Sequence, residues 1–89
     1  MGKTLADWDY IVLKPAQRYL ERMQLADQKR IINALDTLIT APTTLDVKPL
    51  KGRSEMRLRV GKYRILFVED AENKAYIVTT IGSRGDVYK

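Results

Sequence analysis

Hydrophobic and polar positions follow a helical period in the first half of the chain and a strand period in the second. Residues 8–13 (WDYIVL) are aromatic and β-branched, which predicts an opening strand. Apolar side chains in residues 15–23 recur at helical spacing behind a proline, which suits the first turn of a helix. A second apolar stripe runs through residues 31–39 and ends before Pro42. The two stripes predict consecutive helices.

The predicted helices are separated by a break at Leu25, Ala26 and Asp27. Asp27 suits the position before a helix, because its carboxylate can accept hydrogen bonds from the free N–H groups there. We therefore expect Asp27 to cap the second helix. Since the connection is short, the helices should form an antiparallel hairpin.

The second half of the chain alternates with the two-residue period of a β-strand. Apolar side chains alternate with Arg57 and Arg59, so the arginines share one face of their strand and the apolar residues the other. A Gly-Lys pair at 61–62 predicts a tight turn, and a polar turn at 70–74 separates the last two strands. The strands predicted from this pattern cover residues 56–60, 63–69 and 75–81.

The order of these elements predicts an α+β fold that forms a single domain over residues 1–89. An opening strand and an antiparallel helical hairpin are followed by a three-stranded antiparallel meander, in the order β-α-α-β-β-β. A chain of 89 residues allows one modest hydrophobic core. The hairpin should cover one face of the sheet and leave Arg57 and Arg59 on the other. Tyr63 and Arg64 are neighbours in one strand, so they should point to opposite sides.

The net charge of +5 is concentrated in residues 48–64, which we call the basic segment. Residues 1–47 carry equal numbers of basic and acidic side chains, whereas the basic segment contains the single acid Glu55. Charge runs are usually solvated surface, but the arginine content and the strand pattern favour a binding site for a polyanion. The cations of the basic segment are Lys48, Lys51, Arg53, Arg57, Arg59, Lys62 and Arg64.

The chain contains neither cysteine nor histidine. Disulfides, cysteine-based zinc sites and thiol nucleophiles are therefore excluded, and the commonest metal ligand and proton carrier is missing. Glu69, Asp70 and Glu72 share one predicted turn, where solvation is a simpler interpretation than metal binding. We expect no metal and no cofactor. The apolar run at 65–68 is far too short to span a membrane, so a cytoplasmic protein without a membrane partner is expected.

An RNA backbone lying on Arg57 and Arg59 would give the basic segment a chemical role. Arginine binds phosphate bidentately and stabilises the extra charge of a pentacoordinate phosphate. If the neighbouring 2′-hydroxyl attacks, cleavage needs neither a metal nor a protein nucleophile, only alignment and the movement of two protons. Without histidine, the proton carriers must be Tyr, Lys or a carboxylate. Tyr88, four residues after Arg84, is one candidate, although a basic face with a tyrosine also fits a protein that only binds RNA.

Other candidate residues have simpler interpretations. Tyr10 and Tyr19 lie on core-facing stripes, which favours packing over base stacking. Trp8 is interpreted as a core or partner contact. Glu55 is either a general base or a charge that spaces the arginines apart.

Three stretches of the sequence together resemble the RelE/ParE superfamily of bacterial and archaeal toxin–antitoxin modules. They are residues 48–52 (KPLKG), 56–67 (MRLRVGKYRILF) and 81–88 (IGSRGDVY). For RelE-like members, the resemblance implies a compact fold with a helical hairpin on a twisted antiparallel sheet. It also implies an mRNA interferase, a metal-independent endoribonuclease that cuts mRNA on the ribosome by 2′-hydroxyl attack and leaves a cyclic phosphate.

The resemblance assigns roles to individual residues. The family's arginine in the Gly-x-Tyr-Arg stretch falls on Arg64, its Ile-Gly-x-Arg arginine on Arg84, and its late tyrosine on Tyr88. A basic catalytic residue of the preceding strand falls on Arg57, where arginine replaces lysine. Some RelE-like members have a lysine at the position of Glu55, so one basic group is absent here. The residues expected to hold the RNA are Lys48, Lys51, Arg53, Arg59 and Lys62.

ParE-like members share the fold but act on DNA gyrase, and they generally lack the late tyrosine. Tyr88 therefore favours the endoribonuclease. The alternative is a gyrase inhibitor that lacks nuclease activity. A third hypothesis is a non-catalytic RNA-binding protein. Either toxin implies a cognate antitoxin, RelB-like and acidic, whose extended and partly helical segment would cover the basic face. The expected partners are this antitoxin, mRNA on the ribosome, and DNA only indirectly through the antitoxin.

Overall fold

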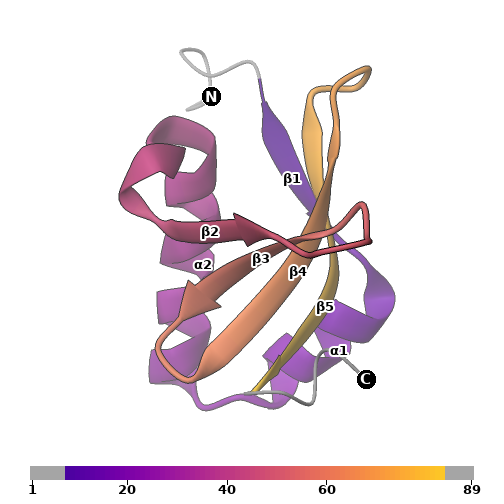
Figure 1. The fold of residues 1–89 in the computed structure, drawn as a ribbon. Helices are drawn as coiled ribbons and strands as arrows, with labels where there is room; N and C mark the ends of the chain where they lie inside the picture. Colours follow the sequence, from indigo (N-terminus) through magenta and orange to yellow (C-terminus); the bar gives the residue numbers. More distant parts are fainter. Residues whose placement is uncertain (1–7, 84–89) are drawn as a thin grey trace.

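A computed structural model describes residues 8–83 as two helices packed on one face of a five-stranded sheet (Figure 1). The helical half of the chain consists of β1 (Asp9–Val12), α1 (Lys14–Arg22), α2 (Leu25–Thr40) and the short 3-10 helix η1 (Pro42–Thr44). The strands that follow are β2 (Asp46–Pro49), β3 (Met56–Val60), β4 (Tyr63–Asp70) and β5 (Ala75–Ser83). The predicted α+β class, with a helical hairpin before an antiparallel meander, is confirmed.

The strand order in the sheet is β1-β5-β4-β3-β2. All neighbours pair antiparallel except β1, which lies parallel to β5 with Tyr10 opposite Tyr76. The sheet is therefore mixed rather than purely antiparallel. Strand β2 was not predicted, because four residues that end in Pro49 are too few to show an alternating pattern.

The start of α2 differs from the sequence prediction. The helix begins at Leu25, after Gln24, and the residue before the helix makes no side-chain capping bond. The prediction that Asp27 caps α2 is wrong, because Asp27 lies inside the first turn. Its carboxylate instead accepts a hydrogen bond of 2.8 Å from the Tyr63 hydroxyl. Asp27 thus bonds to a distant residue instead of capping its own helix. Its negative charge in the first turn still interacts favourably with the helix dipole.

The hydrophobic core lies between the helices and one face of the sheet. The stripe predicted on α2 is confirmed at Ile31 and Leu35, which are fully buried, whereas Ile32 is exposed. The predicted packing role of Tyr10 and Tyr19 is also confirmed, since both side chains pack partly buried against the core. The fully buried large side chains of the sheet on this side are Leu58, Ile65, Phe67 and Val78.

Candidate nucleic-acid interface

In the described part of the chain, the sheet face opposite the two helices collects four cations, and we call it the basic face: Lys48, Arg57, Arg59 and Arg64. Residues directly opposite each other on neighbouring strands share a face. The register places Arg59 opposite Arg64, and Arg57 opposite Lys48. Since Leu58 and Ile65 alternate with these arginines and are buried beneath the helices, the cations must lie on the other side. The predicted separation of Arg57 and Arg59 from the apolar residues of β3 is confirmed.

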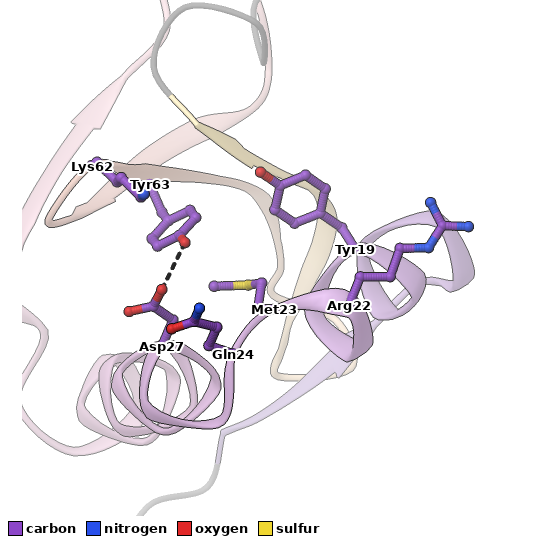
Figure 2. A pocket seen from close by; sticks show the side chains of 7 residues that line it. All are labelled: Tyr19, Arg22, Met23, Gln24, Asp27, Lys62 and Tyr63. Atoms are coloured by element: carbon purple, nitrogen blue, oxygen red, sulfur yellow. Dashed lines mark hydrogen bonds between the residues drawn. The ribbon is translucent and has the colours of Figure 1, made fainter.

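Arg64 belongs to the basic face and Tyr63 does not. Tyr63 is buried on the helix side, where its hydroxyl reaches Asp27 (Figure 2). The predicted opposite orientation of these two neighbours is therefore confirmed. Arg64 is half-buried, and its register partner on β5 is Gly82. Because glycine has no side chain, nothing on β5 competes for the space beside Arg64 in this row.

Tyr63 and Asp27 line an open pocket of about 460 Å³ between the ends of α1 and α2 and the β3–β4 turn (Figure 2). The hydrogen bond to Asp27 raises the pKa of Tyr63, because deprotonation would remove the bond and place two negative charges together. Lys62 also lines this pocket, with its Nζ 5.5 Å from the centre of the Tyr63 ring. Lys62 is thus placed at the pocket and not in the rows of the basic face.

The carboxylate of Asp46 partly neutralises the basic face. Its Oδ1 accepts a hydrogen bond of 2.8 Å from Nη2 of Arg57, and its Oδ2 lies 3.7 Å from Nη1 of Arg59. The Arg57 side chain is 13% exposed and the Arg59 side chain 50% exposed. The Nε of Arg57 is buried and has no hydrogen-bond partner among the described residues. Arg59 is therefore more accessible to a ligand than Arg57.

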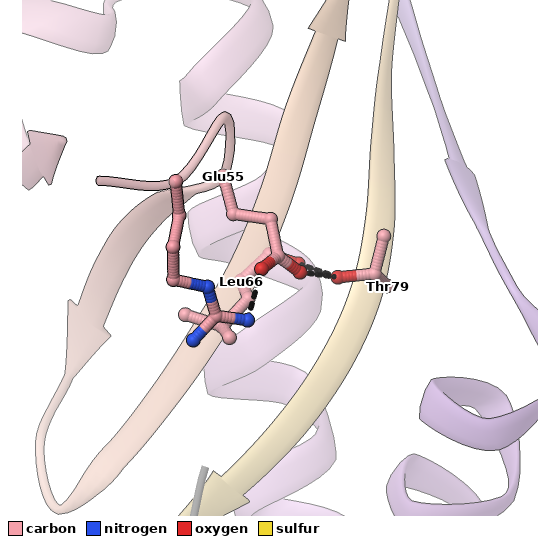
Figure 3. A network of polar contacts seen from close by, with 4 residues as sticks. Glu55, Leu66 and Thr79 are labelled. Carbon is pink, nitrogen blue, oxygen red and sulfur yellow. Dashed lines mark hydrogen bonds and ion pairs between the residues drawn. The ribbon is translucent and has the colours of Figure 1, made fainter. Parts of the chain in front are cut away.

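Glu55 forms a second acid–base contact on the same side of the sheet (Figure 3). One carboxylate oxygen pairs with Nη2 of Arg53, and the other accepts a hydrogen bond of 2.7 Å from the Thr79 hydroxyl on β5. Thr79 was not predicted as a site residue. The only sequence signal for it is that two consecutive polar residues, Thr79 and Thr80, interrupt a largely apolar strand.

The remaining candidates fall on loops or outside the described part of the chain. Lys51 and Arg53 lie in the loop between β2 and β3, and Lys51 is exposed. Arg84 and Tyr88 lie outside the described residues; β5 ends at Ser83, which pairs with Tyr63. Within residues 8–83, no three His, Cys, Asp or Glu side chains are grouped as metal ligands would be. Over the same range, no helix has the length and apolar character needed to cross a membrane.

Comparison with known proteins places this fold in a family. The family model described as the ParE toxin of type II toxin–antitoxin system, parDE, matches residues 5–88. A relative named RelE1, from Methanocaldococcus jannaschii, is 31% identical over 74 residues, which cover 79% of this chain and 82% of the relative. These two matches define the class of the protein: it is a toxin of a type II toxin–antitoxin module. The chain belongs to the RelE/ParE toxin superfamily, and the resemblance of its three sequence stretches is confirmed.

Solved structures share the fold at lower sequence identity. The archaeal RelE–RelB complex from Pyrococcus horikoshii OT3 matches with a TM-score of 0.76 at 22% identity, covering 91% of this chain and 99% of that chain. The isolated E. coli RelE toxin matches with a TM-score of 0.73 at 16% identity, covering 91% and 90%. The mixed sheet with its helical hairpin is therefore the RelE fold.

Proposed function

We propose that this protein is a RelE-like mRNA endoribonuclease, which cleaves mRNA on the ribosome by attack of a 2′-hydroxyl on the adjacent phosphate. One observation carries the proposal: the strand register gathers Lys48, Arg57, Arg59 and Arg64 on the sheet face opposite the two described helices. A row of cations on a sheet face can follow the phosphates of an extended RNA backbone. Arginine can bind each phosphate through two parallel hydrogen bonds.

The arginines would supply the electrostatic part of the reaction. The 2′-oxygen forms a bond to phosphorus while the 5′-oxygen leaves, so the products are a 2′,3′-cyclic phosphate and a 5′-hydroxyl. Arg59 and Arg64, opposite each other in the register, would bind the non-bridging oxygens and stabilise the charge of the pentacoordinate phosphate. Arg57 would contribute through its own donors from a position more buried than that of Arg59.

Two proton transfers must accompany this step, and the described basic face holds no tyrosine to perform them. Tyr63 is excluded as a base near neutral pH, because it faces the helices and its pKa is raised by Asp27. We assign proton transfer to Tyr88, with Arg84 as a further cation at the phosphate, on the strength of the family pattern in residues 81–88. Lys48, Lys51 and Arg53 would hold the RNA beside these arginines, whereas Lys62 lies at the helix-side pocket and is left out of the proposed RNA path.

A cognate antitoxin is the second partner that we propose. Four of the structures with this fold are named as toxin–antitoxin complexes of the RelBE type. An acidic, RelB-like segment lying over the basic face would exclude RNA by occupying the same arginines, and DNA would be contacted only through the antitoxin. The toxin and its target would then meet in the cytoplasm.

A gyrase inhibitor is the alternative, because the family model that matches residues 5–88 is described as ParE. The two functions separate in one induction experiment. The endoribonuclease predicts new mRNA 5′ ends in phase with codons and unchanged plasmid supercoiling. A gyrase inhibitor predicts intact mRNA and lost supercoiling.

The same experiment tests the site with a matched pair of arginine variants. Arg64→Ala should reduce the appearance of new ends by about 100-fold, because one preorganised cation at a developing charge contributes roughly that much. Arg18→Ala, on the exposed surface of α1, should leave cleavage unchanged. Equal cleavage by both variants would contradict the assignment of the basic face.

A further inference from the structure

We propose that Glu55 is a positioning residue, which holds the guanidinium of Arg53 over the open sheet face so that Arg53 can bind an RNA phosphate. The inference rests on the proposed function, since it presumes an RNA backbone on this face.

The contacts of Glu55 span three strands. Glu55 directly precedes β3, yet one of its oxygens accepts a hydrogen bond of 2.7 Å from the Thr79 hydroxyl on β5. Because β4 lies between β3 and β5, the Glu55 side chain must cross β4 on the open face. Figure 3 shows its carboxylate in front of β4, between the loop and Thr79. The second oxygen pairs with Arg53, so the contact ties this arginine to the middle of the sheet.

The residue beneath this crossing is Leu66. The register places it on the open face, opposite Arg57 on one side and Thr80 on the other. A leucine on an uncovered face should be exposed, but Leu66 is only 1% exposed and lies outside the core cluster on the helix side. Figure 3 places Glu55 over this position. The crossing therefore covers an apolar surface, which favours one fixed arrangement over a mobile surface ion pair.

A β-bulge supplies the anchor. Leu66 is opposite Thr80 and Phe67 opposite Val78, so Thr79 is an extra residue without a direct partner. The Thr79 oxygen also lies 3.3 Å from the Leu66 carbonyl, but its single proton goes to the nearer, charged acceptor. Bulges re-aim side chains in this way, and here both threonines lie on the open side.

Among residues 8–83, the only side-chain partner of the Arg53 guanidinium is Glu55, which Nη2 contacts. A guanidinium has five N–H donors, so others remain for a phosphate. The Arg53 side chain is 43% exposed, compared with 18% for Glu55. The half-buried acid fixes the arginine, and the arginine remains the more exposed of the two. Preorganising a long side chain in this way lowers the entropy lost when a phosphate binds.

The negative charge of Glu55 would by itself weaken RNA binding, whereas a positioning role for Glu55 would strengthen it. If Glu55 only added a negative charge to a phosphate-binding face, Glu55→Gln would strengthen RNA binding. If Glu55 positions Arg53, Glu55→Gln weakens RNA binding even though the net charge becomes more positive. The sign of the change separates the two accounts.

The experiment measures equilibrium binding of a single-stranded 2′-O-methyl RNA, which resists cleavage, by fluorescence anisotropy at several salt concentrations. Glu55→Gln and Arg53→Ala should each weaken binding by up to about tenfold, and the double variant no more than either alone. The logarithm of the binding constant falls linearly with the logarithm of the salt concentration, and we call the gradient the salt slope. Each variant should reduce its magnitude by about 0.7, the value for one lost phosphate contact on a single strand. Thr79→Val should weaken binding, and Thr79→Ser, which keeps the hydroxyl, should restore it.

Two controls complete the design. Glu72→Gln removes an exposed acid in the β4–β5 turn and should leave affinity within about twofold. Thermal unfolding of each variant, followed by circular dichroism, checks that the fold is retained. Tighter binding by Glu55→Gln, or additive losses in the double variant, would overturn the positioning role of Glu55 but not the proposed function. Unchanged binding by Arg59→Ala and Arg64→Ala would overturn the proposed function, and this inference with it.

Discussion

Asp46 on β2 binds Arg57 on β3 through a hydrogen bond of 2.8 Å, so the proposed RNA-binding face carries its own competitor for phosphate. The same carboxylate also lies near Arg59. An RNA phosphate that approaches these arginines must share or displace the Asp46 carboxylate. The charge of the basic segment therefore overstates the charge that an RNA encounters.

Replacing Asp46 should strengthen RNA binding. Asp46→Asn leaves the side-chain shape but removes the anion, so we expect affinity to rise about threefold and the salt slope to steepen. Because the Asp46 side chain is 42% exposed and asparagine can still accept the hydrogen bond, the loss of stability should be about 1 kcal/mol. Anisotropy titrations measure the affinity, with Asp36→Asn on α2 as a control that also removes one acid. Weaker binding by Asp46→Asn would mean that Asp46 orients Arg57 instead of competing for it.

The bond between Tyr63 and Asp27 should affect stability and leave cleavage unchanged. Tyr63→Phe removes the hydroxyl that Asp27 accepts, so the melting temperature should fall by a few degrees. Because Tyr63 faces the helices, the cleavage rate should equal that of the unchanged protein. A loss of cleavage without a loss of stability would show that the helix-side pocket takes part in the reaction.

The same hydroxyl predicts a pH dependence. The pKa of Tyr63 in the folded protein is raised above its ordinary value of 10.0, so its contribution to stability is complete below pH 10.0. That contribution is lost as pH rises through the folded-state pKa. Denaturant unfolding should show the difference between Tyr63→Phe and the unchanged protein shrinking at alkaline pH. A difference that grows with pH would contradict this sign.

The turn between β3 and β4 depends on Gly61. Its φ of 58° is in the left-handed region, and a Cβ there would lie 2.5 Å from Nη2 of Arg30. Gly61→Ala should therefore destabilise the fold by about 1–2 kcal/mol in denaturant unfolding. In an Arg30→Ala background the clash disappears and about 1 kcal/mol of backbone strain should remain. A Gly61→Ala variant as stable as the unchanged protein would contradict the backbone assignment.

The basic face could be predicted from the sequence because strand alternation is a local signal. Arg57 and Arg59 alternate with apolar residues, and that pattern alone fixed their side of the sheet. The helical stripes were predictable for the same reason. Family resemblance added the roles of individual arginines, which no periodicity contains.

The unpredicted features all depend on contacts between distant parts of the chain. Asp27 was expected to serve its own helix, but its partner is Tyr63, 36 residues away. Asp46 reaches Arg57 only through the register of a strand too short to recognise. Thr79 reaches Glu55 because a bulge shifts the register of β5. Long-range register is set by packing, so these pairs had no sequence signature.

The central claim is that a 2′-hydroxyl of the mRNA, held against the arginines of the basic face, is the nucleophile. The most direct measurement is cleavage of a ribosome-bound mRNA that carries a single 2′-deoxynucleotide at the cleaved position. We expect this substrate to resist cleavage, while the all-ribose mRNA gives a 2′,3′-cyclic phosphate and a 5′-hydroxyl. Equal cleavage of both substrates would contradict it.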